Sequence, residues 1–254
     1  MDIPTFFQEN PKAALGFSGG VDSSYLLYAG IHSGAKIKAY YVSSEFQPQF
    51  EKADAVRMAD QLGAEITIID ADILSVPNVA ENPSDRCYYC KSAIFSIIKK
   101  AARNDGFSLL IDGTNASDET ADRPGMRALT ELEVQSPLRE CGISKSEVRR
   151  LSKEAGLFTW NKPAYACLAT RIPGGTYITA GDLGRVERAE DSLRALGFSD
   201  FRVRLSGSSA RLELPASQIS RAQCMKVEID ELLHQEFETI VLDPAGRKME
   251  ETVI

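Results

Sequence analysis

The stretch Ser18-Gly19-Gly20-Val21-Asp22-Ser23-Ser24 carries most of the information about the first half of this chain. The apolar residues Ala13–Phe17 before it are typical of a buried strand, and Tyr25–Ala29 after it have the pattern of a helix. The glycine pair allows a tight turn, and the serines and the aspartate suit the first turn of a helix. Unpaired N–H groups at a helix start, the helix dipole and small hydroxyls together favour an oxyanion. Residues 18–24 are therefore predicted to bind a phosphate chain.

The loop GxxxxGK[ST] is absent, because neither Gly-Lys-Ser nor Gly-Lys-Thr occurs in the 254 residues. Residues 18–24 instead resemble the PP-loop of the ATP pyrophosphatases. The resemblance implies that ATP and Mg2+ bind here, that Ser18 and Asp22 act in catalysis, and that attack on the α-phosphorus releases pyrophosphate. It places the following residues around the phosphates: Ser18, Gly19, Gly20, Val21, Asp22, Ser23 and Ser24. The plain alternative is an ordinary Ser/Gly turn between a strand and a helix.

Length and composition narrow the class of protein. A chain of 254 residues with 43% hydrophobic residues has room for one large or two medium domains with ordinary cores. The formal net charge of −7 argues against a broad nucleic-acid surface, so a nucleic-acid partner is not expected, although a local basic patch is compatible with this charge. The N-terminus lacks the order of a signal peptide, and no apolar run approaches the roughly 18 residues of a membrane span. We expect a cytoplasmic protein with no membrane partner.

Short apolar runs alternate with helical stretches between Lys12 and about Lys162. Strands are predicted at Ala13–Phe17, Ile37–Val42, Ile66–Asp70, Leu109–Asp112 and, as a weaker candidate, Leu132–Gln135. Helices are predicted at Ser23–Ser33, Phe50–Leu62, Ser92–Asn104 and Lys145–Ala155, the last with Ser144 and Glu147 as a capping box. Alternation of this kind predicts an α/β fold with a doubly wound, mostly parallel sheet, whose ligands bind at the carboxyl ends of the strands.

The order of elements changes after the Pro/Gly segment Arg171–Gly175. Beyond it we expect a helix at Ala180–Leu196, strands at Asp200–Leu205 and Ala210–Leu214, a helix at Ala216–His234 and a strand at Glu238–Leu242. This order predicts a smaller C-terminal α+β domain, for which a ferredoxin-like arrangement is one candidate. The predicted division is residues 1–170 for the nucleotide-binding domain and residues 171–254 for a domain that binds substrate and mediates oligomerisation.

Five cysteines in a chain without an export signal disfavour a disulfide framework. Cys87 and Cys90 form a CxxC pair flanked by Arg86 and Lys91, just before a predicted helix, where thiol pKa values fall. A redox pair, half of a metal site and buried structural thiols are the three interpretations. Cys167 is the best further ligand, and three thiolates match an iron-sulfur cluster with one open iron better than a closed zinc site.

Two further groups of residues are candidates for binding. The loop 112–118 offers Asp112, Thr114 and Asp118 to Mg2+ or a ribose, although a plain Asx/Gly turn explains the same composition. Nearby Arg123, and likewise the segment 136–139, could bind an anion or only shape a loop. In the C-terminal domain, Arg202 and Arg204 lie two apart on a predicted strand, so both face the same side and suit a phosphate or carboxylates.

Several segments together resemble the LarE family of sulfur transferases. They are SGGVDSS, the CYYC pair, DGTNASD with the following RPG, SPLREC with SKSEVRRLSKEAGL, and above all KPAYACLATRIPGGTYIT. The resemblance spans nearly the whole chain. It implies that ATP adenylates a carboxylate of pyridinium-3,5-biscarboxylic acid mononucleotide, and that sulfur then displaces AMP to give a thiocarboxylate for a nickel-pincer cofactor.

The resemblance also implies a source of sulfur and a set of partners. Members with a CxxC pair resemble cluster-dependent enzymes, in which Cys87, Cys90 and Cys167 would hold a [4Fe-4S] cluster whose fourth iron carries a hydrosulfide supplied as sulfide or by a sulfur donor. Other members instead sacrifice the cysteine at Cys167. The alternative function is that of a tRNA thiolase of the same superfamily. Arg202 and Arg204 would hold the substrate phosphate, in a homo-oligomer. Cys141 and Cys224 match no motif and are interpreted as packing residues.

Overall fold

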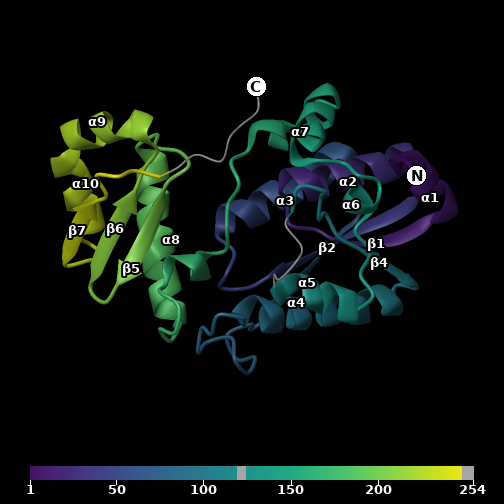
Figure 1. The fold of residues 1–254 in the computed structure, drawn as a ribbon, viewed down its shortest axis with the longest axis horizontal. Coiled ribbons are helices and arrows are strands. Elements are labelled where there is room, and N and C mark those ends of the chain that lie inside the picture. The colour runs from purple at the N-terminus through teal and green to yellow at the C-terminus, as the bar shows by residue number, and fades with distance from the viewer. Residues whose placement is uncertain (119–123, 248–254) are drawn as a thin grey trace. The chain divides into compact units, whose positions relative to one another are not determined.

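The computed structural model describes residues 1–118 and 124–247, which fall into two compact units (Figure 1). The larger unit comprises Met1–Val79 and Asp85–Lys162. The smaller comprises Ala80–Ser84 and Pro163–Ile254, of which residues up to 247 are described. The chain therefore passes into the second unit at 162/163, and it also visits that unit once earlier, at residues 80–84.

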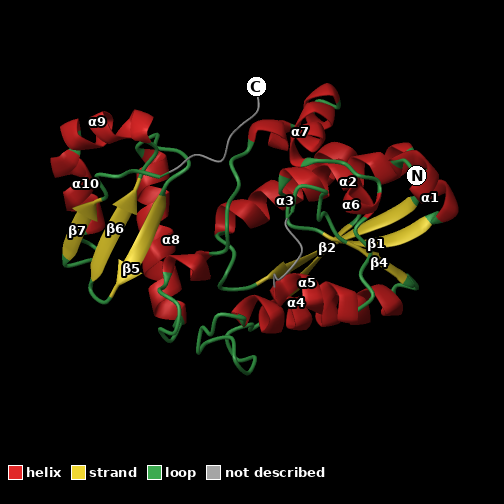
Figure 2. Cartoon of the chain, in the orientation of Figure 1, coloured by secondary structure: helices red, strands yellow, loops and turns green. Residues whose placement is uncertain are grey.

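A parallel four-stranded sheet lies at the centre of the larger unit (Figure 2). Its strands are β1 (Lys12–Gly16), β2 (Lys36–Ser43), β3 (Ile66–Asp70) and β4 (Leu109–Ile111), in the order β3-β2-β1-β4. All three neighbouring pairs are parallel, with Ala13 opposite both Ile37 and Leu109. The predicted α/β fold with a parallel sheet is confirmed.

Helices cover both faces of this sheet (Figure 1). They are α1 (Ile3–Glu9), α2 (Val21–His32), α3 (Gln49–Leu62), α4 (Arg86–Asn104), α5 (Pro124–Glu131), α6 (Pro137–Glu140), α7 (Lys145–Glu154) and the 3-10 turn η1 (Phe158–Asn161). One apolar core joins Leu15 to Leu26 of α2, Met58 of α3 and Val148 of α7. The opposite core joins Tyr40 to α4 and α5. Burial on both faces explains the apolar centres of β1 and β2, whereas the edge strand β3 is partly exposed.

The structure differs from the expected elements of this unit in two places. Residues 132–135 form no named strand, since only Gln135 bridges to Ile111 at the outer edge of β4. Helix α4 begins at Arg86 rather than Ser92, so that Cys87 and Cys90 lie inside its first turns. The capping box before α7 is present, because the Ser144 hydroxyl accepts a hydrogen bond from the Glu147 N–H.

The smaller unit is α+β. Its elements are η2 (Leu168–Arg171), α8 (Ala180–Ala195), β5 (Arg202–Ser206), β6 (Ser209–Glu213), α9 (Ala216–Cys224), α10 (Lys226–Leu233) and β7 (Thr239–Leu242). Strand β6 pairs antiparallel with β5 and parallel with β7. This three-stranded mixed sheet is not the ferredoxin-like arrangement. The helix expected over Ala216–His234 is broken at Met225.

Across the described residues, none of the helices has the length and apolar character that a membrane span requires.

Candidate functional site

The loop after β1 lies where the strand order reverses. The chain runs from β1 to β2 and β3 on one side, and then returns to place β4 on the other side of β1. Ligands of doubly wound sheets bind in the crevice at such a point. The loop after β4 closes onto it, since a Cβ atom on Gly113 would lie 2.8 Å from the Ser23 nitrogen. Residues 18–24 and 112–118 therefore form one local site.

The loop of residues 18–24, called the PP-loop below for the resemblance of its sequence, leaves the start of α2 without a side-chain cap. Gly20 is the N-cap residue and makes no side-chain cap hydrogen bond. The Ser23 hydroxyl donates instead to the Gly20 carbonyl at 3.2 Å and lies 3.1 Å from the Ser18 hydroxyl. Gly19 has φ +70°, and a Cβ atom there would lie 2.9 Å from the Ala55 Cα. The arrangement presents main-chain N–H groups and two hydroxyls together, as an anion site requires.

Asp22 is held by two residues far away in sequence. The Lys145 Nζ atom lies 2.5 Å from Asp22 Oδ2, and the Asn115 amide donates to Oδ1 at 3.2 Å. Burial raises the pKa of Asp22, the Lys145 charge opposes that rise, and nearby Asp118 adds to it. Lys145 was not among the predicted site residues. The structure thus brings the Lys145 ammonium group and the Asp118 carboxylate near Asp22 of the loop 18–24.

Asp112 and Asp118 have different surroundings. Asp112 is buried, and its carboxylate accepts hydrogen bonds from the Ser136 hydroxyl at 2.6 Å, the Thr114 hydroxyl at 2.5 Å and the Thr114 N–H at 3.2 Å. These bonds shape the loop. Asp118 accepts one hydrogen bond, from the Asn115 N–H at 3.0 Å. Asp118 is therefore better suited than Asp112 to hold a cation. Arg123 lies outside the described residues.

A cavity of about 180 Å³ adjoins the PP-loop within the larger unit. Its lining residues are Gly16, Phe17, Ser18, Tyr40, Tyr41, Val42, Gln47, Glu51, Lys91, Ile94, Phe95 and Ile98. The walls are mainly apolar, and Ser18 stands at one side. A ligand whose phosphates lie on the PP-loop has room here for an apolar ring.

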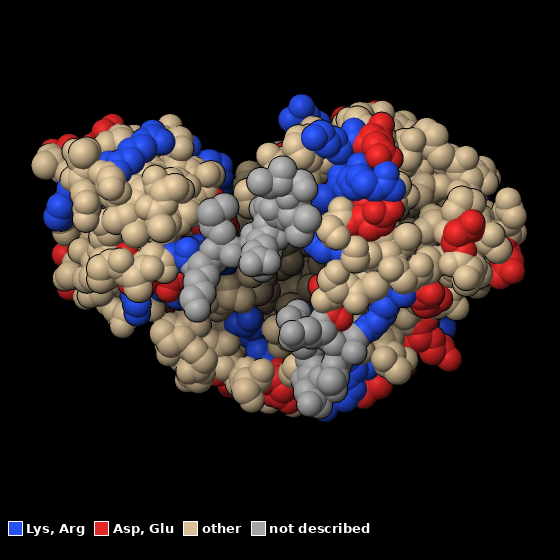
Figure 3. Space-filling model, turned by 45° about the horizontal axis from the view of Figure 1, so that its top comes forward, with Lys and Arg blue, Asp and Glu red and all other residues tan. Residues whose placement is uncertain are grey.

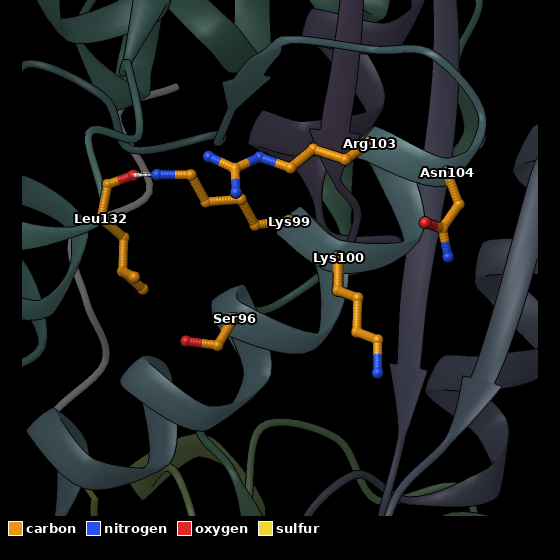
Figure 4. A pocket seen from close by; sticks show the side chains of 6 residues that line it. All are labelled: Ser96, Lys99, Lys100, Arg103, Asn104 and Leu132. Carbon is orange, nitrogen blue, oxygen red and sulfur yellow. Dashed lines mark hydrogen bonds between the residues drawn. The ribbon is translucent and has the colours of Figure 1, made fainter.

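A wider surface pocket of about 420 Å³ is separate from this site. Figure 4 shows its lining residues, which are Ser96, Lys99, Lys100, Arg103, Asn104 and Leu132. The Lys99 ammonium donates to the Leu132 carbonyl at 2.7 Å. This pocket lies along the last turns of α4, whereas Cys87 and Cys90 lie at the first.

The CxxC pair occupies the N-terminal turns of α4. Asp85 is the N-cap residue and makes no side-chain cap bond, Cys87 is exposed, and Cys90 is half-buried. Residues three apart share one face of a helix, so both thiols point to the same side. Tyr88 between them donates to Glu131 at 2.6 Å and lies under the guanidinium of Arg127. Helix α5 thereby fixes the first turn of α4.

Cys167 belongs to the smaller unit. It precedes η2 and is half-buried, and its carbonyl accepts hydrogen bonds from the Thr170 N–H at 3.0 Å and hydroxyl at 2.9 Å. The buried guanidinium of Arg171 donates to Glu190 at 2.8 Å and to the Ala166 carbonyl at 2.8 Å. The turn that carries Cys167 is thus anchored from inside its own unit.

No group of three His, Cys, Asp or Glu side chains stands ready for a metal ion in residues 1–118 and 124–247. Two of the three predicted ligands lie in one unit and the third in the other. The donor types suit an iron-sulfur cluster, because thiolates are its usual ligands. Cys141 packs against the main core as predicted, whereas Cys224 is exposed and the packing interpretation of it is wrong.

The paired arginines of β5 are both engaged with the protein. Arg202 is buried and donates to the carbonyls of Phe201 and Ala164 at 2.6 and 2.8 Å. Burial, together with the charges of Arg171 and Arg247, lowers its pKa to about 10. Arg204 is more open and donates to Glu213 at 3.0 Å. Arg204 is the more accessible of the two for a ligand.

Charges of both signs are interspersed over the face shown in Figure 3. Among the ion pairs of the larger unit, Arg150 of α7 donates to both Glu147 and Glu154. Ion pairs of this kind leave less free positive charge for a polyanion, which agrees with the acidic composition.

No family model matches the chain. It is 33% identical over 238 residues, 92% of this chain and 86% of the other, to the pyridinium-3,5-bisthiocarboxylic acid mononucleotide synthase of Lactiplantibacillus plantarum. It is 39% identical over 223 residues, 87% of this chain and 82% of the other, to an uncharacterized protein of Synechocystis. The tRNA-specific 2-thiouridylase MnmA of Thermotoga petrophila is 25% identical over 196 residues, 59% of this chain and 54% of the other.

A parallel sheet with an uncapped phosphate loop after its first strand, together with these relatives, defines an ATP-dependent sulfur transferase with the PP-loop fold. The identity and coverage of the Lactiplantibacillus relative settle the family within that class. The chain belongs to the LarE family.

Proposed function

We propose that this protein uses ATP to adenylate a carboxylate of pyridinium-3,5-biscarboxylic acid mononucleotide, and that a sulfur nucleophile then displaces AMP to leave a thiocarboxylate. The observation that carries the proposal is the uncapped start of α2 with the Asp22–Lys145 pair beside it, in a LarE-family chain. The product named for the Lactiplantibacillus relative, a bisthiocarboxylic acid mononucleotide, supports this substrate.

The residues around the PP-loop suit this first step. A carboxylate is a poor electrophile, and an acyl adenylate is a good one because AMP leaves readily. The main-chain N–H groups at the start of α2 and the Lys145 ammonium would stabilise charge on the departing pyrophosphate. Asp22 and Asp118 would hold the Mg2+ that accompanies ATP, since carboxylate oxygens are its preferred protein ligands. The cavity beside Ser18 would take the adenine ring.

For the sulfur step, we propose that Cys87, Cys90 and Cys167 hold a [4Fe-4S] cluster. When bound by three thiolates, such a cluster keeps one iron open for a reduced sulfur ligand. The residues contribute soft donors, two of them on one face of the first turns of α4. The competing route is sacrificial donation of sulfur from Cys167 itself. Iron and sulfide analysis after anaerobic purification separates the two routes.

The smaller unit is proposed to bind the substrate phosphate and to associate with a second copy of the chain. Arg204, with a 41% exposed side chain, is the first contact expected for the phosphate. Arg202 would join it by giving up its hydrogen bonds to the Phe201 and Ala164 carbonyls and donating to the phosphate instead. Replacement of Arg204 by Gln should therefore raise the substrate KM more than it changes kcat.

The test combines products and variants. With ATP, Mg2+ and the dicarboxylate substrate, the protein should form AMP, pyrophosphate and thiocarboxylate, and Asp22→Ala should abolish AMP formation. Asp60→Ala, an exposed position on α3, is the matched control. Anaerobically reconstituted protein should hold about four irons, and Cys87→Ala but not Cys224→Ala should lose them. Thiolation of tRNA instead of the mononucleotide would favour a function like that named for the 2-thiouridylase relatives.

A further inference from the structure

Five residues between β3 and α4 fold with the smaller unit. This segment, Ala80–Ser84, is here called the strap. Its Ala80 carbonyl accepts a hydrogen bond from the Ile178 N–H at 2.7 Å, and its Asn82 carbonyl accepts one from the Gly175 N–H at 2.8 Å. The Asn82 side-chain amide donates to the Pro173 carbonyl at 2.8 Å. Three hydrogen bonds thus tie the strap to residues 173–178.

Asn82 has an unusual backbone conformation for its position. Its φ is +54°, it is only 4% exposed, and a proline follows it. Residues before proline favour extended backbone, and left-handed conformations of residues other than glycine persist only where the surroundings impose them. Glycine would adopt this φ more readily but could not supply the amide that donates to Pro173. Both the backbone and the side chain of Asn82 therefore serve the set of hydrogen bonds between the strap and residues 173–178, here called the clasp.

The clasp joins the two parts of the chain that carry the three predicted ligands. Pro173 follows Cys167 by six residues, and Cys87 follows Asn82 by five. Five residues span at most about 18 Å when fully extended, so the covalent chain limits how far Cys87 can lie from Asn82 in any arrangement of the units. On the other side, the Arg171–Glu190 pair anchors the turn between Cys167 and Pro173.

We propose that Asn82 is a positioning residue: it locks the strap onto residues 173–178 and so limits, through five residues of chain on one side and six on the other, how far the Cys87–Cys90 pair can move from Cys167. The inference rests on the proposed function for its chemical purpose, namely that the three thiols act together. Its geometric content is independent, because proximity of the thiols can be measured in protein without iron.

The test measures cross-linking between single pairs of cysteines in the full-length chain. A parent variant keeps Cys87 and Cys167 and carries Cys90→Ser, Cys141→Ser and Cys224→Ser. A short bismaleimide should link its two thiols within one chain, as mass spectrometry of the monomer band would identify. Rates are normalised to the reaction of each thiol with a monofunctional maleimide.

Adding Asn82→Ala to this parent should lower the cross-linking rate by about threefold to tenfold, as expected for the loss of one hydrogen bond. Asn78→Ala is the matched control, because Asn78 also has positive φ (64°) but is exposed and lies outside the strap. Asn82→Gly keeps the backbone conformation and loses only the amide. It provides a milder variant should Asn82→Ala fail to fold, and its rate should also fall below that of the parent.

Equal rates in the Asn82 variants and Asn78→Ala, or no intramolecular cross-link in the parent, would overturn the proposal. Iron binding is then measured separately, in chains that keep all five cysteines. Cross-linking that depends on Asn82 in a protein that assembles no cluster would uphold the positioning role and reject the cluster. Loss of iron in Asn82→Ala but not in Asn78→Ala, together with slower cross-linking, would uphold both.

Discussion

Asp22 and Lys145 show how far single residues could be predicted. Asp22 was found because the PP-loop pattern contains it. Its partner Lys145 lies 123 residues away, in the segment SKSEVRRLSKEAGL, which carries part of the family resemblance but indicates no site role for the lysine. One local signal existed. Lys145 is the first residue of α7, and a cation in the first turn opposes the helix dipole. A lysine at such a position suggests a role outside its own helix.

Replacing Lys145 should make stability depend on pH in a defined direction. Burial already raises the pKa of Asp22 above 3.8, so the folded protein binds this proton more tightly than the unfolded chain. Lys145→Gln removes the opposing charge and raises that pKa further. The variant should therefore lose free energy of unfolding relative to the native chain as pH rises from 4 to 7, by about 1–2 kcal/mol at pH 7.

Denaturant unfolding at pH 4.5 and pH 7 measures this difference. Lys226→Gln, which removes an exposed pair with Asp230 on α10, serves as the control and should show no pH-dependent loss. If Lys145→Gln and the native protein had the same free energy of unfolding at both pH values, the Asp22–Lys145 contact would contribute nothing to the stability of the folded state.

At the scale of elements, the PP-loop depends on contact with α3. Gly19→Ala should both strain the backbone, because φ is +70°, and force Cβ against the Ala55 backbone. Gly34 has a similar φ of +78°, but a Cβ atom there would have no other atom within 4 Å, so Gly34→Ala serves as the comparison. Gly19→Ala should lower the free energy of unfolding by more than the roughly 1 kcal/mol expected for Gly34→Ala. It should also abolish AMP formation, because the loop that binds ATP would be displaced. Equal free energies of unfolding for the two variants would show that Ala55 does not constrain the loop.

The buried Arg171–Glu190 pair should stabilise the smaller unit through η2 and α8. Glu190 also accepts hydrogen bonds from the Tyr165 hydroxyl at 2.5 Å and the Val203 N–H at 3.0 Å. Glu190→Gln leaves a buried guanidinium without its counter-charge and should cost about 3–5 kcal/mol. Chemical denaturation of the variant, compared with Lys226→Gln, checks this. A loss below 1 kcal/mol would require that water reaches the pair.

Elements with strong periodicity were predictable and weakly marked ones were not. The four strands were found to within a residue or two because apolar runs between helices are typical of buried parallel strands. The start of α4 was missed because Cys and Tyr favour helices only weakly. Residues 132–135 were expected to form a strand from their apolar character, but only Gln135 pairs with β4. Whether these residues pair with β4 depends on where the rest of the fold places them, which their own apolar character does not determine.

At the scale of the whole molecule, the sequence suggested two domains but not how the chain is shared between them. The expected division was at residue 170, and the compact units divide at 162/163. The strap was not expected at all, because residues 80–84 show no pattern that links them to the second unit. Its hydrogen bonds to residues 173–178 are non-local, and a single sequence carries no signal for such contacts.

The central claim is that the carboxylate of the substrate attacks the α-phosphorus of ATP held on the PP-loop. Transfer of oxygen tests this most directly. With the dicarboxylate substrate labelled with oxygen-18 in ordinary water, each AMP released during thiocarboxylate formation should carry one labelled oxygen, detected by mass spectrometry. Unlabelled AMP, or ADP in its place, would contradict the account.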